Sequence, residues 1–278
     1  DGKTYPFKRY YAHKAYLLRV LPALQSLSTA YLLTDERRYG EACAVLLAAL
    51  AENFPGPRFH REYCYDGPYG HRSGMVTDYI WECITLPVIA LAYDAVKPIY
   101  EQSDRLLGAL RGKGLPAGSP EEARQFVEDR IFRQAMQALL DNAIAGNPGH
   151  HQLAAITMAL VMDDVDGATR PNSLDMVEYT YYGGYAPAGY VFSNFLTRDG
   201  GGFEGPGYDR IKFDYVEVAK RMEVLRARHA ERLDVRRYPP LLDEPKAQAM
   251  YDFFIDITLL DAFAPEVGDA GGARLKPG

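Results

Sequence analysis

Cysteine is scarce in this chain, and long apolar runs are missing. Three cysteines occur among 278 residues, and they form neither a CxxC pair nor an even set. A zinc ribbon or a disulfide framework is therefore not predicted, and Cys43 and Cys83 are expected to be small buried hydrophobes in apolar helices. No run of about 18 apolar residues is present, so we predict no membrane span. A net charge of -6 argues against non-specific nucleic-acid binding, which depends on a basic surface.

The signature motifs of several enzyme classes are absent as well. The sequence contains no HExxH metal motif, no GxSxG serine motif and no P-loop lysine. Residues 200–205 match GxGxxG in form, but no predicted strand precedes them. Residues 164–167 lack the ligand series of a calcium loop. The adjacent His150 and His151 would point about 100° apart on a helix, so they are poorly placed to hold one metal ion. We predict neither a metal nor a cofactor.

The pattern that is present is helical. Apolar residues recur close to every 3.6 residues, and we find no sustained strand alternation and no hairpin dipeptide. The expected fold class is all-α, built from helical hairpins joined by long loops. Residues 265–278, rich in glycine, proline and alanine, are expected to form a disordered tail or linker. Because the chain starts without methionine or a signal peptide, we expect it to be processed or excised from a longer protein. The predicted helices cover residues 15–33, 39–50, 77–96, 119–145, 151–162, 173–182 and 213–232.

Two segments carry groups suited to proton transfer. Gly146-Asn-Pro-Gly-His-His-Gln152 places amides and imidazoles in the first turn of an apolar helix, where free backbone N–H groups and the helix dipole stabilise an anion. The glycine-rich segment from Asp199 to Tyr208 presents a carboxylate and a phenol, as the lip of an active site would. For each histidine the alternative is a structural role in the core, which we expect to hold for one of the two. The alternative for the glycine-rich segment is a flexible loop.

A third segment combines charge with the single tryptophan. Arg72 precedes a predicted helix on which Asp78 shares a face with Trp81 and with Glu82. An arginine in a local basic cluster can bind a polyanionic sugar even though the net charge is negative. The alternative interpretation is a capped helix with a buried tryptophan.

These segments resemble the helical domain of the heparinase II/III-like polysaccharide lyases, a family that includes alginate and glycosaminoglycan lyases. The resemblance implies an incomplete α/α toroid over residues 1–264, followed by a large β-sandwich region that these 278 residues do not contain. It also implies a periplasmic or secreted location. It covers roughly residues 5–215 and rests on Tyr10-Tyr-Ala-His-Lys-Ala-Tyr16, on Arg72…Asp78-Tyr-Ile-Trp-Glu82, on Gly146–Gln152 leading into Ala-Leu-Val-Met-Asp-Asp164, and on Glu204-Gly-Pro-Gly-Tyr208.

The same resemblance implies β-elimination at a uronate. Asn147 and His151 match the pair at the helix entry that neutralises the substrate carboxylate, and His150 is the alternative if the register is shifted by one. Tyr208 matches the loop tyrosine that handles protons. In relatives the β-rich region often adds another catalytic histidine. The residues expected to bind substrate are Arg72, Trp81, Glu82, Gln152 and Glu204.

The chemistry of elimination suits these side chains independently of the resemblance. Removing a proton beside an ionised carboxylate places a second negative charge next to the first. Amide and imidazolium donors stabilise that charge, and the loss of one such donor costs a few kcal/mol. A tyrosine, whose ordinary pKa is near 10, can act unaided as the acid on the leaving oxygen, but it needs a nearby cation to act as the base.

The leading hypothesis is therefore a polysaccharide lyase that binds an anionic polysaccharide or oligosaccharide. One alternative is a glycoside hydrolase on a similar helical toroid, which would use paired carboxylates such as Asp78 or Glu82 with Glu204. Another is a non-catalytic, carbohydrate-binding helical protein. Ultraviolet absorbance separates the first alternative from the lyase, because elimination leaves an unsaturated sugar and hydrolysis does not.

Overall fold

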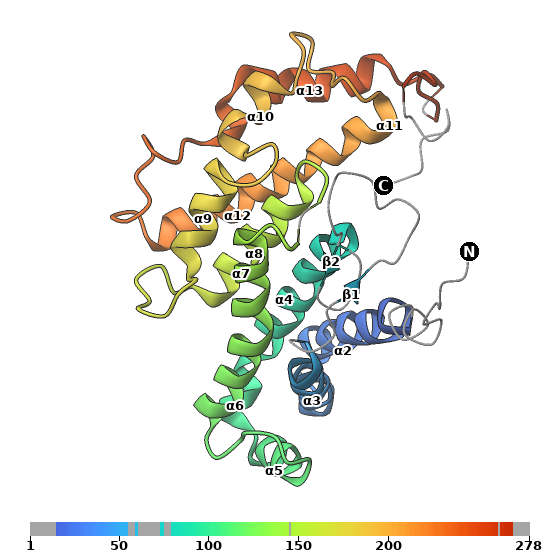
Figure 1. Cartoon of the computed structure of the whole chain (residues 1–278). Coiled ribbons are helices and arrows are strands. Elements are labelled where there is room, and N and C mark those ends of the chain that lie inside the picture. The colour runs from blue at the N-terminus through green and yellow to red at the C-terminus, as the bar shows by residue number, and fades with distance from the viewer. Residues whose placement is uncertain are drawn as a thin grey trace, which may run out of the picture. The chain divides into compact units, whose positions relative to one another are not determined.

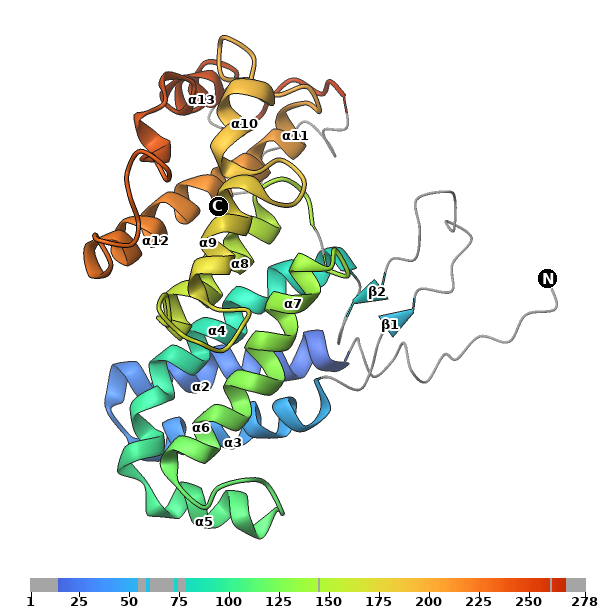
Figure 2. The ribbon, with the colours of Figure 1, turned by 60° about the vertical axis from the view of Figure 1, so that its left-hand side comes forward.

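The computed structural model describes residues 15–54, 81–144, 146–260 and 262–268, together with the backbone of 59–60, 73–74 and 79–80 (Figures 1 and 2). The protein is all-α, as the sequence predicted. The described strands are two short segments, β1 (Phe59–His60) and β2 (Ser73–Gly74), which pair antiparallel. The chain divides into two compact units. The first holds residues 1–146 and 168–172, and the second holds residues 147–167 and 173–278.

The first unit is a set of helices that pack around α4. Helices α2, α3 and α4 contact one another, and α6 contacts both α3 and α4. Two of its elements, η1 and η2, are π-helical turns that continue directly into the next helix. Its elements are η1 (Tyr16–Val20), α2 (Leu21–Thr34), α3 (Arg37–Asn53), α4 (Tyr79–Gln102), α5 (Asp104–Gly112), α6 (Pro120–Val127), η2 (Glu128–Arg133) and α7 (Gln134–Leu140).

Capping explains where two helices of this unit begin. The Ser119 hydroxyl accepts a hydrogen bond from the backbone N–H of Glu122, and Pro120 occupies the first turn of α6. Ser103 caps α5 in the same way through Leu106. The helix predicted to end near residue 96 continues through a second internal proline to Gln102, because its apolar face stays buried over the whole length.

One helix of the described chain is long and apolar enough to cross a membrane by length and composition alone. It spans Trp81–Gln102 in α4, and most of it is buried by its neighbours. A core helix of a globular protein has the same properties, so this helix does not decide between the two settings.

The second unit is centred on α8, which is buried on almost every side, as predicted. Helix α8 packs against α9 and α12. The predicted helix 173–182 is confirmed as α9, whereas α10, α11 and α13 were not predicted. Residues 265–268 of the predicted tail are described, and the rest of it lies outside the described residues. The elements of this unit are α8 (His150–Met162), α9 (Ser173–Tyr182), α10 (Ala188–Asn194), α11 (Pro206–Asp209), η3 (Arg210–Phe213), α12 (Asp214–Arg228), η4 (Leu241–Asp243) and α13 (Pro245–Asp256).

Helices α8 and α12 run parallel. Their first residues, His150 and Asp214, are paired with each other. The residues that follow their last turns, Asp163 and His229, are also paired. The first turns of the two helices therefore lie together at one end of the second unit, where α12 continues directly from η3, and their C-termini lie together at the other.

Candidate functional site

The entry of α8 is built around a glycine. Gly149 has a φ of +101°, a conformation that side chains rarely adopt. A Cβ at this position would lie 2.8 Å from the Cβ of Asp214 and 3.0 Å from the carbonyl oxygen of Ile211. Only glycine therefore lets the start of α8 approach the start of α12. The Gln152 amide oxygen accepts a hydrogen bond from the Gly149 N–H at 2.9 Å, which satisfies a donor of the helix entry.

His151 and Gln152 lie in the core rather than on a surface. Both are fully buried, and Nε2 of His151 donates to the carbonyl oxygen of Tyr185 at 2.6 Å. The Gln152 amide group donates to the carbonyls of Tyr185 and Ala186 at 2.8 and 3.0 Å. The structure therefore does not support His151 or Gln152 as a contact for substrate, because their polar groups already join α8 to the segment after α9.

His150 is the histidine of the pair that reaches the surface. Its Nδ1 lies 2.6 Å from Oδ2 of Asp214, and the two side chains are 17% and 27% exposed. An ionised carboxylate only accepts hydrogen bonds, so Nδ1 carries the proton and Nε2 is left as the basic nitrogen of the neutral ring. This arrangement is a partly shielded histidine–aspartate pair that can take up and release a proton.

Two further predicted residues accompany this pair in the second unit. Asn147 is half-buried and lies three residues before His150. Tyr208 is 37% exposed on α11, which continues through η3 into α12 and so into Asp214. Asn147, His150 and Tyr208 therefore all belong to the second unit, and that they share one site stays a prediction.

The glycine-rich segment before Tyr208 is closely packed. A Cβ on Gly200 would overlap the backbone of Ala249 in α13, and a Cβ on Gly202 would overlap the buried ion pair of Asp209 and Lys212. The Gly202 N–H donates to the Asp209 carboxylate at 2.9 Å. Glycine is therefore needed at two positions, one packed against α13 and one packed against the Asp209–Lys212 pair. This packing does not support the flexible-loop interpretation. Glu204, in the same segment, is half-buried.

The remaining predicted residues belong to the first unit. Arg72 lies outside the described residues. Trp81 is 53% exposed, so the alternative of a buried tryptophan is wrong. Glu82 is fully buried, and the structure does not support its prediction as a substrate contact in this conformation.

Sequence analysis missed Asp214. It lies 64 residues from His150 in the sequence. Acidic residues are also common in the first turn of a helix, so an aspartate there does not stand out. No local pattern separates this residue from the other acids of the same stretch, so only the packing of α12 on α8 identifies it.

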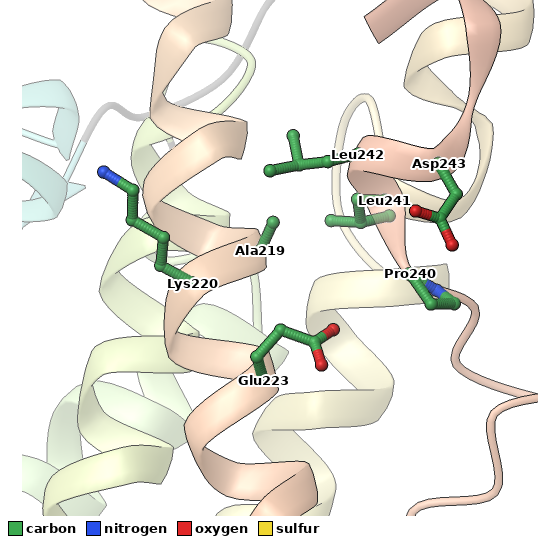
Figure 3. Close-up of a pocket in the computed structure, with 7 residues that line it drawn as sticks. All are labelled: Ala219, Lys220, Glu223, Pro240, Leu241, Leu242 and Asp243. Atoms are coloured by element: carbon green, nitrogen blue, oxygen red, sulfur yellow. The ribbon is translucent and has the colours of Figure 1, made fainter.

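Two pockets of the second unit are lined by other residues, and both linings include Pro240, Leu241 and Asp243. One, of about 330 Å³, lies between α12 and η4, with Ala219 and Leu242 facing each other across it (Figure 3). The Glu223 carboxylate points toward Pro240, whereas the Lys220 amine points away. The other, of about 340 Å³, lies beside α10. No predicted site residue lines either pocket.

Comparison of the chain with protein-family models and with curated proteins found no match. The resemblance to lyases therefore depends on the motifs themselves.

Proposed function

We propose that this chain is the helical part of a polysaccharide lyase that cleaves a uronate polymer by β-elimination. The observation that carries the proposal is the pairing of His150 with Asp214 where α8 and α12 begin. Of the two adjacent histidines, His150 takes the catalytic role, and His151 takes the structural one.

The N-terminus of α8 suits an anionic substrate. It presents the positive end of the helix dipole, so a sugar carboxylate is stabilised there. Asn147 adds an amide donor at the same entry. Together these groups would offset the second negative charge that develops when the proton next to the carboxylate leaves.

Proton transfer follows from the tautomer that Asp214 imposes. His150 Nε2 takes the proton from the carbon beside the carboxylate, and the electron pair of that C–H bond becomes the new carbon–carbon double bond. The glycosidic C–O bond breaks, and the leaving oxygen takes a proton from the Tyr208 hydroxyl. Water then returns the proton to tyrosine, and His150 releases its own to solvent. General acid and base groups of this kind each contribute roughly 100- to 10,000-fold to a rate.

The same proposal covers the wider architecture. The helical hairpins would form part of an incomplete α/α toroid, a β-sandwich region would lie in a longer protein, and the protein would be periplasmic or secreted. The resemblance supports these points, and the helical character of the chain agrees with them.

The test is a panel of alginate, heparan sulfate, chondroitin sulfate and hyaluronan, followed by ultraviolet absorbance of the unsaturated product. We expect one polymer to give absorbance, and Tyr208→Phe to lower the rate by about 100-fold, since only the acid is lost. The matched control is Tyr190→Phe, another exposed tyrosine of the second unit. New reducing ends without absorbance would instead indicate a hydrolase, and retention of polymer without any product would indicate a binding domain.

A further inference from the structure

Three aromatic rings form a row on the second unit. The Tyr185 and Phe195 ring centroids are 5.5 Å apart and the rings are perpendicular, while those of Phe195 and Phe203 are 5.9 Å apart and tilted by 33°. The two outer rings are well exposed, at 55% for Tyr185 and 66% for Phe203. Exposed single aromatics are ordinary, but rings that contact one another on a surface indicate a place where something stacks.

The backbone at one end of the row is bound to the first turn of α8. The Tyr185 carbonyl is the group to which His151 and Gln152 donate, and these two residues directly follow His150 in α8. The far end of the row, Phe203, precedes Glu204 and the α11 segment that carries Tyr208. The row therefore connects the two segments from which the proposed site is built.

The row is held in place before any ligand arrives. The buried Lys212 amine lies 5.8 Å from the centre of the Phe203 ring and is paired with Asp209. The backbone around Phe203 is anchored by Gly202, whose N–H donates to the same Asp209. A ligand that stacks here does not have to order the rings first, so little affinity is lost on binding.

Arg198 supplies a cation beside the row, in the same segment as the carboxylates of Asp199 and Glu204. Residues 197–201 form a closed turn between Phe195 and Phe203, with the Thr197 N–H donating to the Gly201 carbonyl at 2.7 Å. Arg198 is exposed at the tip of this turn and has no ion pair within the part of the chain that the structure describes. Asp199 is held by its own turn, through Thr197 and the Gly201 N–H, so it does not neutralise the arginine by a direct pair.

The geometry points to Tyr185, Phe195 and Phe203 as a stacking subsite for the sugar rings next to the cleaved linkage of an anionic polysaccharide, with Arg198 binding a carboxylate or sulfate of the same chain. This inference rests on the proposed function for its choice of ligand. It adds that the protein holds several successive sugars, so affinity depends on the length of the chain.

The experiment is gel retardation of the whole chain in native gels that contain alginate, heparan sulfate, chondroitin sulfate or hyaluronan. With the polymer that retards the wild type most, we expect Phe203→Ala and Tyr185→Ala each to raise the dissociation constant at least about 5-fold. Phe203→Tyr, which keeps the ring, should bind like the wild type. Because affinity depends on the length of the sugar chain, the disaccharide of that polymer should displace little polymer from the wild type. It should displace equally little from the variants. The matched control is Tyr190→Ala, an exposed tyrosine that contacts Tyr182 and not the row.

Retardation is scored separately from turnover, so the two proposals can fail independently. Ring-dependent retardation without any unsaturated product supports the subsite and contradicts the lyase. Turnover with unchanged binding by Phe203→Ala and Tyr185→Ala overturns the subsite and leaves the lyase standing. Absence of retardation of the wild type by every polymer overturns the subsite. Equal thermal unfolding of wild type and variants shows that a loss of binding is not a loss of folding.

Discussion

The two ends of the parallel pair α8 and α12 use the same side chains in different surroundings. At the starting end His150 is paired with Asp214 through Nδ1, and at the finishing end His229 is paired with Asp163 through Nε2 at 2.7 Å. At the finishing end Arg228 also binds Asp163, at 3.1 Å. The first end holds the N-terminus of α8 beside an amide, and the second holds the C-termini of both helices beside cations.

Helix dipoles explain why one end suits catalysis and the other suits structure. The N-terminus of α8 favours an anion from outside, such as a substrate carboxylate, whereas the converging C-termini are already balanced by arginine and histidine. A histidine–aspartate pair is thus not a sign of function by itself. The helix termini next to the pair decide whether an anionic or a cationic ligand is favoured there.

The largest expected effect separates the two histidines by turnover. His150→Ala should lower kcat/KM by about 1000-fold, because it removes the proposed base, while His229→Ala should leave it little changed. Initial rates of absorbance increase on the preferred polymer measure both. Equal losses of kcat/KM in the two variants would show that His150 and His229 do not have different roles.

A second experiment changes the backbone at the starting end. Gly149→Ala forces a side chain into a φ of +101° and against Asp214, so we expect a loss of about 2–3 kcal/mol in the free energy of unfolding. Urea denaturation measures it. Gly108→Ala in α5 is the matched control, since nothing lies within 4 Å of a Cβ there. The control should be neutral or stabilising, as alanine favours a helix more than glycine does. A similar effect at both positions would mean that the close approach of α8 and α12 does not require glycine.

A third experiment removes charge at the finishing end. Asp163 adopts a left-handed conformation with a φ of 55°, which asparagine also tolerates, so Asp163→Asn removes charge without straining the backbone. We expect a loss of about 1 kcal/mol, because the pair with His229 is half-buried and Arg228 adds to it. Denaturation at low and high salt measures it, and the loss should shrink with salt. A loss of turnover in this variant would contradict a purely structural role.

Sequence analysis could predict the helices and the chemical types of the site but not its geometry. Periodicity located α9 to the residue, because its apolar face repeats regularly. It could not choose between His150 and His151, since α8 is apolar on all faces and no polar face marks the outside. The glycines near residue 200 were predicted to present a carboxylate and a phenol at the lip of a site. They are needed instead for close contacts with α13, a helix distant in the sequence. Contacts of that kind leave no local pattern.

The smallest expected effect comes from an ion pair at neither end, which provides a baseline for the pair at Asp163. Burial raises the pKa of Glu178, but hydrogen bonds from Arg237 and Tyr238 and the charge of Arg237 outweigh burial and lower that pKa overall. The folded protein therefore binds this proton less tightly than the unfolded chain does. The stabilisation is complete above the ordinary pKa of a glutamate and is lost as pH falls through the lowered value.

Glu178→Gln should thus cost about a few tenths of a kcal/mol at pH 7, a small amount because the pair is largely exposed to solvent. The difference from wild type should close as the solution becomes more acidic than the ordinary glutamate range. Urea midpoints measured from neutral pH into that acidic range check it. Because the Glu178 pair is largely exposed, a cost as large as that of Asp163→Asn would mean that half-burial and Arg228 add nothing to the Asp163 pair.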